Sequence, residues 1–166
     1  SRTGGGVCIL VKRSLKLDII KLAEGDEAEF VAIKLCDLKN TLVIFAHYGP
    51  QPYMGSDIVN ECVKEIGYEV EQSIKSGADI LWCGDQNIWI GDRIRGNNDR
   101  VTRAGKMLID IIDNNKLEIV NNRCRRTTTY KDVNSGVERA LDIILTNKGE
   151  LIKKIEIDEI PRGDNQ

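Results

Sequence analysis

The sequence predicts an α/β fold in which β-sheets form the middle of the domain and helices lie outside. Short, β-branched apolar runs fill the first and last thirds of the chain, and two segments between them have helical periodicity. The chain has 166 residues, of which 41% are hydrophobic, which suffices for one packed core but hardly for two. We therefore expect residues 1–166 to form a single domain, or a part of one.

Three strands are predicted in the first third of the chain. The runs at residues 6–12, 29–35 and 41–46 are short, β-branched and partly alternating. Turn-forming residues such as those at 24–26 and 39–40 bound them. Because the three runs are so close in sequence, we expect them to form a meander.

Two helices and an interior strand are predicted in the middle of the chain. After a loop with two prolines, Ser56 can cap a helix over about residues 57–75. Residues 78–83 form an apolar run typical of an interior strand, and a second helix is expected over about residues 103–115. The first helix has an apolar residue at every fourth position, which indicates one buried face: Ile58, Cys62, Ile66, Val70 and Ile74.

The last third of the chain returns to strand patterns. Strands are expected at residues 117–120, 127–130, 140–146 and 152–157. No internal repeat, low-complexity tract or linker divides the sequence, which favours one continuous unit.

Charge and hydropathy exclude several function classes. The 24 basic and 26 acidic residues give a net charge of −2, which lacks the signature of a general nucleic-acid coat or a binder of anionic membranes. No apolar stretch approaches the roughly 18 residues of a spanning helix, and the N-terminus lacks the form of a signal peptide. The 5 cysteines include no close pair of the zinc or redox kind, which indicates free thiols. We expect an intracellular protein, nuclear or cytoplasmic, without a membrane partner.

The most specific local signal follows the apolar run at residues 78–83. A glycine turn there presents Asp85 and, two residues later, Asn87. Side chains at positions i and i+2 of an extended segment point to the same side. A carboxylate that accepts a proton, beside an amide that orients a water, suits phosphodiester hydrolysis. Taken alone, these residues are more often a turn in which Asp and Asn cap backbone groups.

Polar side chains also follow the predicted strand at residues 41–46. Tyr48 can donate a hydrogen bond to a phosphate oxygen, and His47 is the only imidazole of the chain. A lone histidine beside a tyrosine is more often structural than catalytic. His47 should point away from Tyr48 if the strand persists to that point.

Asp142 introduces a carboxylate into the apolar run at residues 140–146. A buried aspartate is costly unless it is paired, so a specific partner is expected to hold it. The alternative is an edge strand on which the carboxylate faces water.

The net charge hides two basic loops, at residues 93–106 and 121–131. Both lie beside the candidate site in sequence order, where they can follow a phosphate backbone or simply carry solvated charge. The candidate nucleic-acid-binding residues are Arg93, Arg95, Arg100, Arg103, Arg123, Arg125 and Arg126.

Taken in order, these features resemble the endonuclease/exonuclease/phosphatase superfamily, and most closely the endonuclease domain of non-LTR retrotransposon polyproteins. Each matching stretch is weak alone, but the order and spacing of the set are specific. The resemblance implies a four-layer α/β sandwich, with two packed β-sheets flanked by helices, incomplete at both termini. The matching stretches are residues 4–11, 46–51, 84–87, 105–108, 120–122, 128–130 and 141–145.

The resemblance also implies phosphodiester hydrolysis with Mg²⁺ or Mn²⁺. Asp85 matches the aspartate that activates or aligns the attacking water, and Asn87 matches its orienting partner. Tyr48 matches the tyrosine that hydrogen-bonds the scissile phosphate, and Asp142 matches the aspartate that buttresses a catalytic histidine. Asp85 and Asn87 are the possible metal ligands within this chain.

Two parts of the family pattern have no counterpart in the sequence. In the family, a strand with an Asn and a strand ending in a metal-binding Glu precede the Gly-Gly-Val strand, and a Ser-Asp-His motif follows the Leu-Asp strand. Without that Glu and His, the site lacks its principal Lewis acid and an electrostatic contact to the phosphate. We expect the 166 residues alone to be inactive or nearly so, with sheet edges and core faces uncovered.

Three functions fit these features. The favoured one is a Mg²⁺-dependent DNA endonuclease that nicks target DNA to prime reverse transcription, with a reverse transcriptase domain downstream in the parent protein. The second is a phosphoesterase of the same fold that acts on phosphoinositide, lipid or nucleotide substrates. The third is a non-catalytic remnant that binds nucleic acid through its basic loops.

Overall fold

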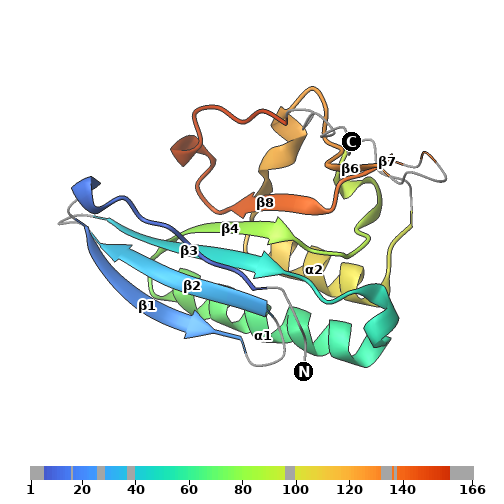
Figure 1. The fold of residues 1–166 in the computed structure, drawn as a ribbon, viewed down its shortest axis with the longest axis horizontal. Coiled ribbons are helices and arrows are strands. Elements are labelled where there is room, and N and C mark those ends of the chain that lie inside the picture. Colours follow the sequence, from blue (N-terminus) through green and yellow to red (C-terminus); the bar gives the residue numbers. More distant parts are fainter. Residues whose placement is uncertain are drawn as a thin grey trace, which may run out of the picture.

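The computed structural model describes residues 6–15, 17–25, 29–36, 40–95, 100–131, 136 and 138–157. Its main element is a six-stranded mixed sheet in the order β1-β2-β3-β4-β8-β5, and β6 and β7 pair separately (Figure 1). The predicted α/β fold is confirmed. The strands are β1 (Asp18–Glu24), β2 (Glu29–Cys36), β3 (Thr41–Tyr48), β4 (Asp79–Asp85), β5 (Glu118–Ile119), β6 (Tyr130–Lys131), β7 (Glu138–Arg139) and β8 (Asp142–Thr146).

The order of the strands follows from how they are connected. β1, β2 and β3 form an antiparallel meander, whereas β3 and β4 are parallel. A parallel pair needs a long crossover, which helix α1 (Ser56–Lys75) supplies. β8 runs antiparallel to both β4 and β5.

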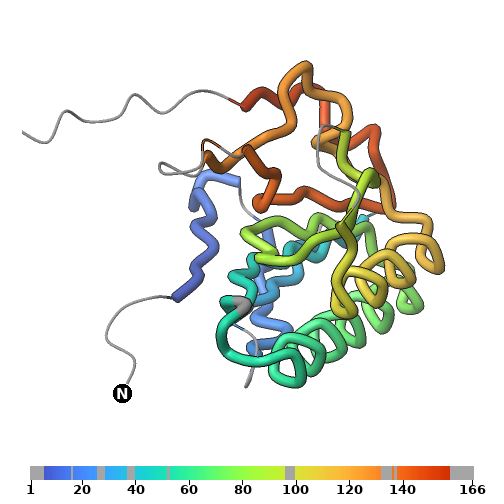
Figure 2. Tube along the Cα trace, turned by 90° about the vertical axis from the view of Figure 1, so that its right-hand side faces the viewer, coloured from blue at the N-terminus to red at the C-terminus, as the bar shows by residue number. Residues whose placement is uncertain are grey.

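Helices α1 and α2 (Arg103–Asn114) cover the same face of the sheet (Figures 1 and 2). Gly55 is the N-cap residue of α1 and Ser56 is already helical, so the expected serine cap is wrong by one residue. Ile58 is 39% exposed because a spacing of four residues advances about 40° beyond a full turn at each step, which rotates the ends of the stripe away from the core. Short 3₁₀ helices complete the fold: η1 (Arg13–Leu15), η2 (Pro52–Met54), η3 (Gly91–Arg93), η4 (Val120–Arg123) and η5 (Gly149–Leu151).

The hydrophobic core lies between the sheet and the two helices. Alternate side chains of each central strand point to it, as the period of two dictates. Trp82 and Phe45 come from the sheet and Ile66 and Leu108 from the helices, and all four are almost completely buried. None of the five cysteines forms a disulfide, as predicted. Within the described part of the chain, no helix is both long and apolar enough to cross a membrane.

Residues 6–15 lie across the opposite face of the sheet (Figures 1 and 2). The prediction of a strand at residues 6–12 is wrong, because this described segment pairs with no other strand. Val7 and Ile9 are half-buried while Leu10 is 91% exposed, so the segment has the alternation of a strand without the partner that would complete it. Residues 4 and 5 of the family match lie outside the described residues.

The meander is completed instead by β1, which the sequence analysis missed. β1 pairs with β2 from Asp18↔Cys36 to Glu24↔Val31, with a register shift between Lys21 and Ala23. Most of β1 is solvent-exposed. Its residues therefore show the weak apolar pattern of an edge strand rather than that of an interior one.

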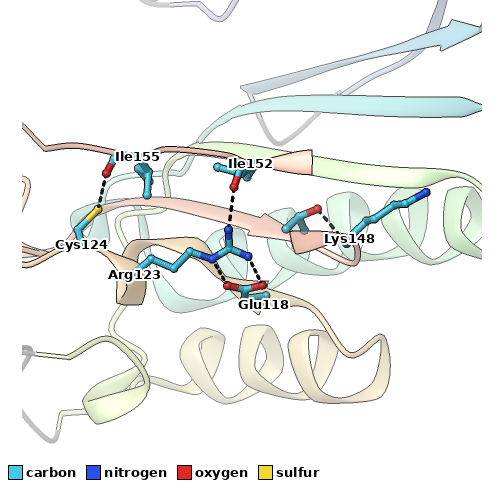
Figure 3. Close-up of polar contacts among 7 residues, drawn as sticks. Glu118, Arg123, Cys124, Lys148, Ile152 and Ile155 are labelled. Carbon is cyan, nitrogen blue, oxygen red and sulfur yellow. Dashed lines mark hydrogen bonds and ion pairs between the residues drawn. The ribbon is translucent and has the colours of Figure 1, made fainter. Parts of the chain in front are cut away.

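The predicted strand at residues 152–157 is also wrong, since the structure gives this stretch no strand pairing. Side chains of Arg123, at the end of η4, and of Cys124, which follows it, hold the backbone of this stretch instead (Figure 3). The Arg123 guanidinium donates to the Ile152 carbonyl at 2.9 Å, and the Cys124 thiol donates to the Ile155 carbonyl at 3.7 Å. These side-chain bonds replace a ladder of backbone bonds.

Candidate functional site

Three of the predicted site residues are direct neighbours across the ends of three strands. Tyr48, the last residue of β3, pairs with Asp85, the last residue of β4, and Asp85 pairs with Asp142, the first residue of β8. Directly paired residues place their Cβ atoms about 5 Å apart on one face of a sheet. The row lies at the end of the sheet toward which the β3 and β4 arrows point in Figure 1.

The row faces away from the helices. Phe45, His47 and Trp82 point into the core, so Tyr48 and Asp85, at the alternate positions, point to the opposite face. Gly84 permits this close arrangement: its φ is +145°, and a Cβ there would lie 1.7 Å from the His47 carbonyl oxygen. The two strands can approach at their ends only because this position has no side chain.

Asp85 has a raised pKa. Partial burial is the main cause, and the negative charge of Asp142 adds to it. The Asn87 backbone N–H, which donates to Asp85 Oδ1 at 2.9 Å, opposes the shift. A carboxylate held in this way binds a proton more tightly than a fully solvated one, which suits it to accept a proton from water.

Asn87 is fixed by the turn that ends β4. Its φ is +49°, and its side-chain amide donates to the Gly49 carbonyl at 2.9 Å. The strand ends at Asp85, so the expected i, i+2 geometry does not continue to Asn87. Both residues bond backbone groups, as the turn-capping alternative proposed, and Asn87 still lies directly beside the carboxylate.

Tyr48 is positioned to donate a hydrogen bond. Its ring is 36% exposed, and its hydroxyl oxygen accepts a bond of 2.5 Å from the Gln51 amide. Because that contact uses a lone pair, the hydroxyl proton is left for an external acceptor such as a phosphate oxygen. Sequence reasoning did not identify Gln51 as a functional residue, although it lies within the matched stretch at residues 46–51.

His47 points away from Tyr48, as predicted. It is buried against Trp82, and its Nδ1 lies 2.9 Å from Gln86 Oε1. Burial lowers the His47 pKa to about 4, and the contact with Gln86 only partly offsets this effect. The imidazole is therefore neutral at pH 7 and has a structural role.

Asp142 differs from its expected surroundings. The run at residues 140–146 suggested a buried carboxylate, but β8 begins at Asp142, and its side chain is exposed. Its backbone is held on both sides: Asn121 donates to the Asp142 carbonyl at 2.9 Å, and the Asp142 N–H donates to Thr129 Oγ1 at 3.1 Å. Asn121 and Thr129 belong to matched stretches to which the sequence analysis assigned no role.

Most arginines of the two basic loops make intramolecular contacts. Arg93 pairs with Asp113, and Arg126 lies 3.7 Å from a Glu138 oxygen. Arg123 donates to Glu118 at 2.7 Å (Figure 3). The guanidinium of Arg95 donates to the Cys124 and Arg125 carbonyls. These four arginines hold the loops together.

The remaining arginines are differently placed. The guanidinium carbon of Arg100 lies 5.2 Å from the centre of the Trp89 ring, and that of Arg139, which was not predicted, lies 4.7 Å from it. Arg103 and Arg125 are exposed, and no described residue forms an ion pair with either. Nucleic-acid contact by the predicted arginines therefore remains a prediction, with Arg100, Arg103 and Arg125 the best placed for it.

The described residues supply only part of a metal site. They contain no group of three or more His, Cys, Asp or Glu side chains that could hold an ion. Asp85 supplies a carboxylate and Asn87, which bonds it, a side-chain amide oxygen, and Mg²⁺ is commonly bound by one or two carboxylates and several waters. The donors fit a hard divalent cation, but a closed cage needs additional ligands.

No protein-family profile and no curated protein matches the chain, but solved structures do. The endonuclease domain of TRAS1, a telomere-specific non-LTR retrotransposon, matches with a TM-score of 0.53 and 12% identity over 81% of this chain and 56% of that one. An AP endonuclease from Archaeoglobus fulgidus matches with a TM-score of 0.52 and 14% identity over 70% and 52%. The chain has the endonuclease/exonuclease/phosphatase fold. A 3′-5′ exonuclease from Neisseria meningitidis, with a TM-score of 0.50 and 12% identity over 69% and 51%, agrees.

The chain spans about half the length of the structures that it matches. At such low identity the comparison shows the fold alone. The positions of Tyr48, Asp85 and Asp142 come from the strand pairing of this chain itself.

Proposed function

We propose that the chain is the central part of a divalent-metal-dependent phosphodiesterase, a DNA endonuclease that nicks target DNA for retrotransposition. The observation that carries this proposal is the cross-strand row of Tyr48, Asp85 and Asp142, with Asn87 bonded to Asp85. The likeness to the endonuclease domain of a retrotransposon supports DNA as the substrate.

The row provides some of the groups that phosphodiester hydrolysis needs. Asp85 accepts or directs the proton of the attacking water. Tyr48 donates its hydroxyl proton to a non-bridging phosphate oxygen, and Gln51 fixes the direction of that hydroxyl. Asp85 and Asn87, with a carboxylate that the family pattern places on an earlier strand, would hold Mg²⁺ or Mn²⁺, which would supply Lewis acidity.

The test is a plasmid-nicking assay on the chain expressed with its native flanking reading frame. We expect nicking in Mg²⁺, none in EDTA, and a loss of about 100-fold or more in Asp85→Asn. Asp79→Asn is the matched control, since Asp79 begins the strand that Asp85 ends and pairs with Lys148 at the other end of the sheet. Equal activity of Asp85→Asn and Asp79→Asn would contradict the proposed site.

The same protein distinguishes the alternative functions. In a competition between labelled duplex DNA and small phosphoesters, preference for the small substrates would favour a phosphoesterase of the same fold. DNA binding without cleavage, unaffected by Asp85→Ala, would indicate a binding remnant. The retrotransposon assignment requires a reverse transcriptase domain downstream, and its absence from the parent gene would remove that part.

A further inference from the structure

A cavity of about 210 Å³ lies beside the proposed site, on the helix side of the sheet. Asn87 and Trp89 form one wall, and the first turns of α1 and α2 form the other. We call this cavity the Trp89 pocket; its polar and aromatic lining residues are Ser56, Asn60, Asn87, Trp89, Arg100, Thr102 and Arg103. It is smaller than the roughly 300–1,000 Å³ typical of drug-sized ligands, so it suits a single nucleotide rather than a larger ligand.

The wall formed by α2 is rigid. The Thr102 N–H donates to the Trp89 carbonyl at 3.1 Å, and Thr102 Oγ1 accepts from the Gly105 N–H at 3.0 Å. A Cβ at Gly105 would lie 1.9 Å from the Trp89 carbonyl oxygen, so the helix begins in direct contact with the loop backbone. The pocket therefore exists before any ligand binds.

The charges of α2 favour an anion at its start. Arg103 and Lys106 lie near the positive end of the helix dipole, and Asp113 lies near the negative end. Each such placement is unfavourable in a free helix, because the charge meets a partial charge of the same sign at the helix end. Asp113 is compensated by its ion pair with Arg93, but no described acidic residue pairs with Arg103. A bound phosphate would convert this unfavourable arrangement into a favourable one.

The wall formed by α1 contributes an unsatisfied polar group. Asn60 is 5% exposed and lines the pocket, and among the described residues no donor reaches its Oδ1. A buried acceptor without a donor is unfavourable, because it has lost its hydrogen bonds to water and gained none in their place. The N-cap residue Gly55 provides no side-chain cap for the same helix, and Asp57 in its first turn does not line the pocket. The pocket thus pairs an anion-attracting end with a group that requires an N–H donor.

We propose that the Trp89 pocket binds one nucleotide of the substrate strand next to the scissile phosphate, with its phosphate at Arg103 and its base donating to Asn60. The proposal rests on the proposed function, because the substrate is taken to be a nucleic acid. A nucleotide has both required features, a phosphate and a flat base with N–H donors. Asn87 lines the pocket and bonds Asp85, so the bound nucleotide adjoins the site.

The first experiment measures DNA binding by fluorescence anisotropy in EDTA, with a labelled oligonucleotide and the 166-residue chain. Arg103→Ala should weaken binding by about fivefold or more and lower the salt slope by about one. Lys106→Ala is the matched control, because it removes the same charge from the same helix without touching the pocket, and it should change affinity less than about twofold. Equal effects of the two substitutions would overturn the proposal.

The second experiment titrates deoxyadenosine monophosphate and follows tryptophan fluorescence. Trp82 is buried in the core, so a change on binding reports on Trp89. We expect saturable binding in the unmodified chain and in Lys106→Ala, and no binding in Asn60→Leu or Arg103→Ala. Circular dichroism would verify that the last two variants are folded. The proposal would be overturned if inorganic phosphate bound as tightly as the nucleotide, or if the tryptophan fluorescence showed no saturable change.

The two experiments separate this inference from the proposed function. Nucleotide binding without DNA binding would contradict the endonuclease assignment and leave the pocket as a small-nucleotide site. If Arg103→Ala and Lys106→Ala weakened DNA binding equally and the nucleotide did not bind, the inference about the pocket would be wrong and the proposed function would stand.

Discussion

The two faces of the six-stranded sheet have the same alternating strands but different surroundings. On the helix-covered face, Trp82, Phe45 and Leu145 are sealed from solvent. On the opposite face, which the extended segment at residues 6–15 crosses (Figure 2), Leu81 and Ile144 are only half-buried. Side chains alternate between the two faces along every strand, so the difference in burial comes from what packs against each face.

The comparison also divides function from stability. Tyr48, Asp85 and Asp142 lie on the open face, whereas the buried imidazole of His47, one residue from Tyr48, lies on the sealed one. The Trp89 pocket opens beside the helix-covered face, at the same end of the sheet. Substitutions on the sealed face should therefore affect folding, and those on the open face should affect chemistry.

The largest expected difference between the faces is in core packing. Trp82→Ala should lower the free energy of unfolding by about 3–5 kcal/mol, because it leaves a cavity in the sealed core. Leu81→Ala, the neighbouring residue on the open face, should lower it by only about 1–2 kcal/mol. Urea denaturation of both variants measures the difference, and equal losses would show that the open face is equally well packed.

The next effect is a pH dependence caused by His47. Its pKa is about 4 in the folded chain and near its ordinary value when unfolded, so the unfolded state binds more protons between about pH 4 and 6.5. Stability should therefore fall by about 3 kcal/mol as the pH falls through this window. His47→Gln removes the titrating group, and denaturant midpoints that change equally with pH in both proteins would contradict the assignment.

A smaller effect concerns the carboxylates of the open face. Asp142→Asn should lower the Asp85 pKa because it removes a neighbouring negative charge, but only in part, since burial is the larger cause. Carbon-detected NMR titration of the Asp85 carboxyl measures the shift. An unchanged pKa would show that the two side chains do not interact in solution.

The smallest effect is expected at the outermost apolar residue of the open face. Leu10 is 91% exposed, so Leu10→Ser should change the free energy of unfolding by no more than about 0.5 kcal/mol. The same denaturation experiment measures it. A loss comparable to that of Leu81→Ala would mean that another chain covers Leu10 in solution.

Much of the fold could be predicted from local pattern. The helices and the strands around residues 29–36, 41–48 and 79–85 follow from periodicity that tertiary contacts do not override. The segments at residues 6–12 and 152–157 carry equally good strand patterns but form none, because a strand exists only where a neighbour supplies backbone partners. β1 shows the converse, since a weak pattern becomes a strand once β2 pairs with it.

Local sequence patterns indicate which residue types could carry chemistry: Asp85 and Asn87 in a turn, Tyr48 after a strand, and Asp142 before an apolar run. That Tyr48, Asp85 and Asp142 are cross-strand neighbours follows from the folded structure, because strand order and register join residues far apart in the chain. The folded structure also decides that Arg93, Arg95, Arg123 and Arg126 hold loops together, while Arg100, Arg103 and Arg139 gather around Trp89. A charge count cannot make that distinction, since an arginine's role depends on which partner the fold brings within reach.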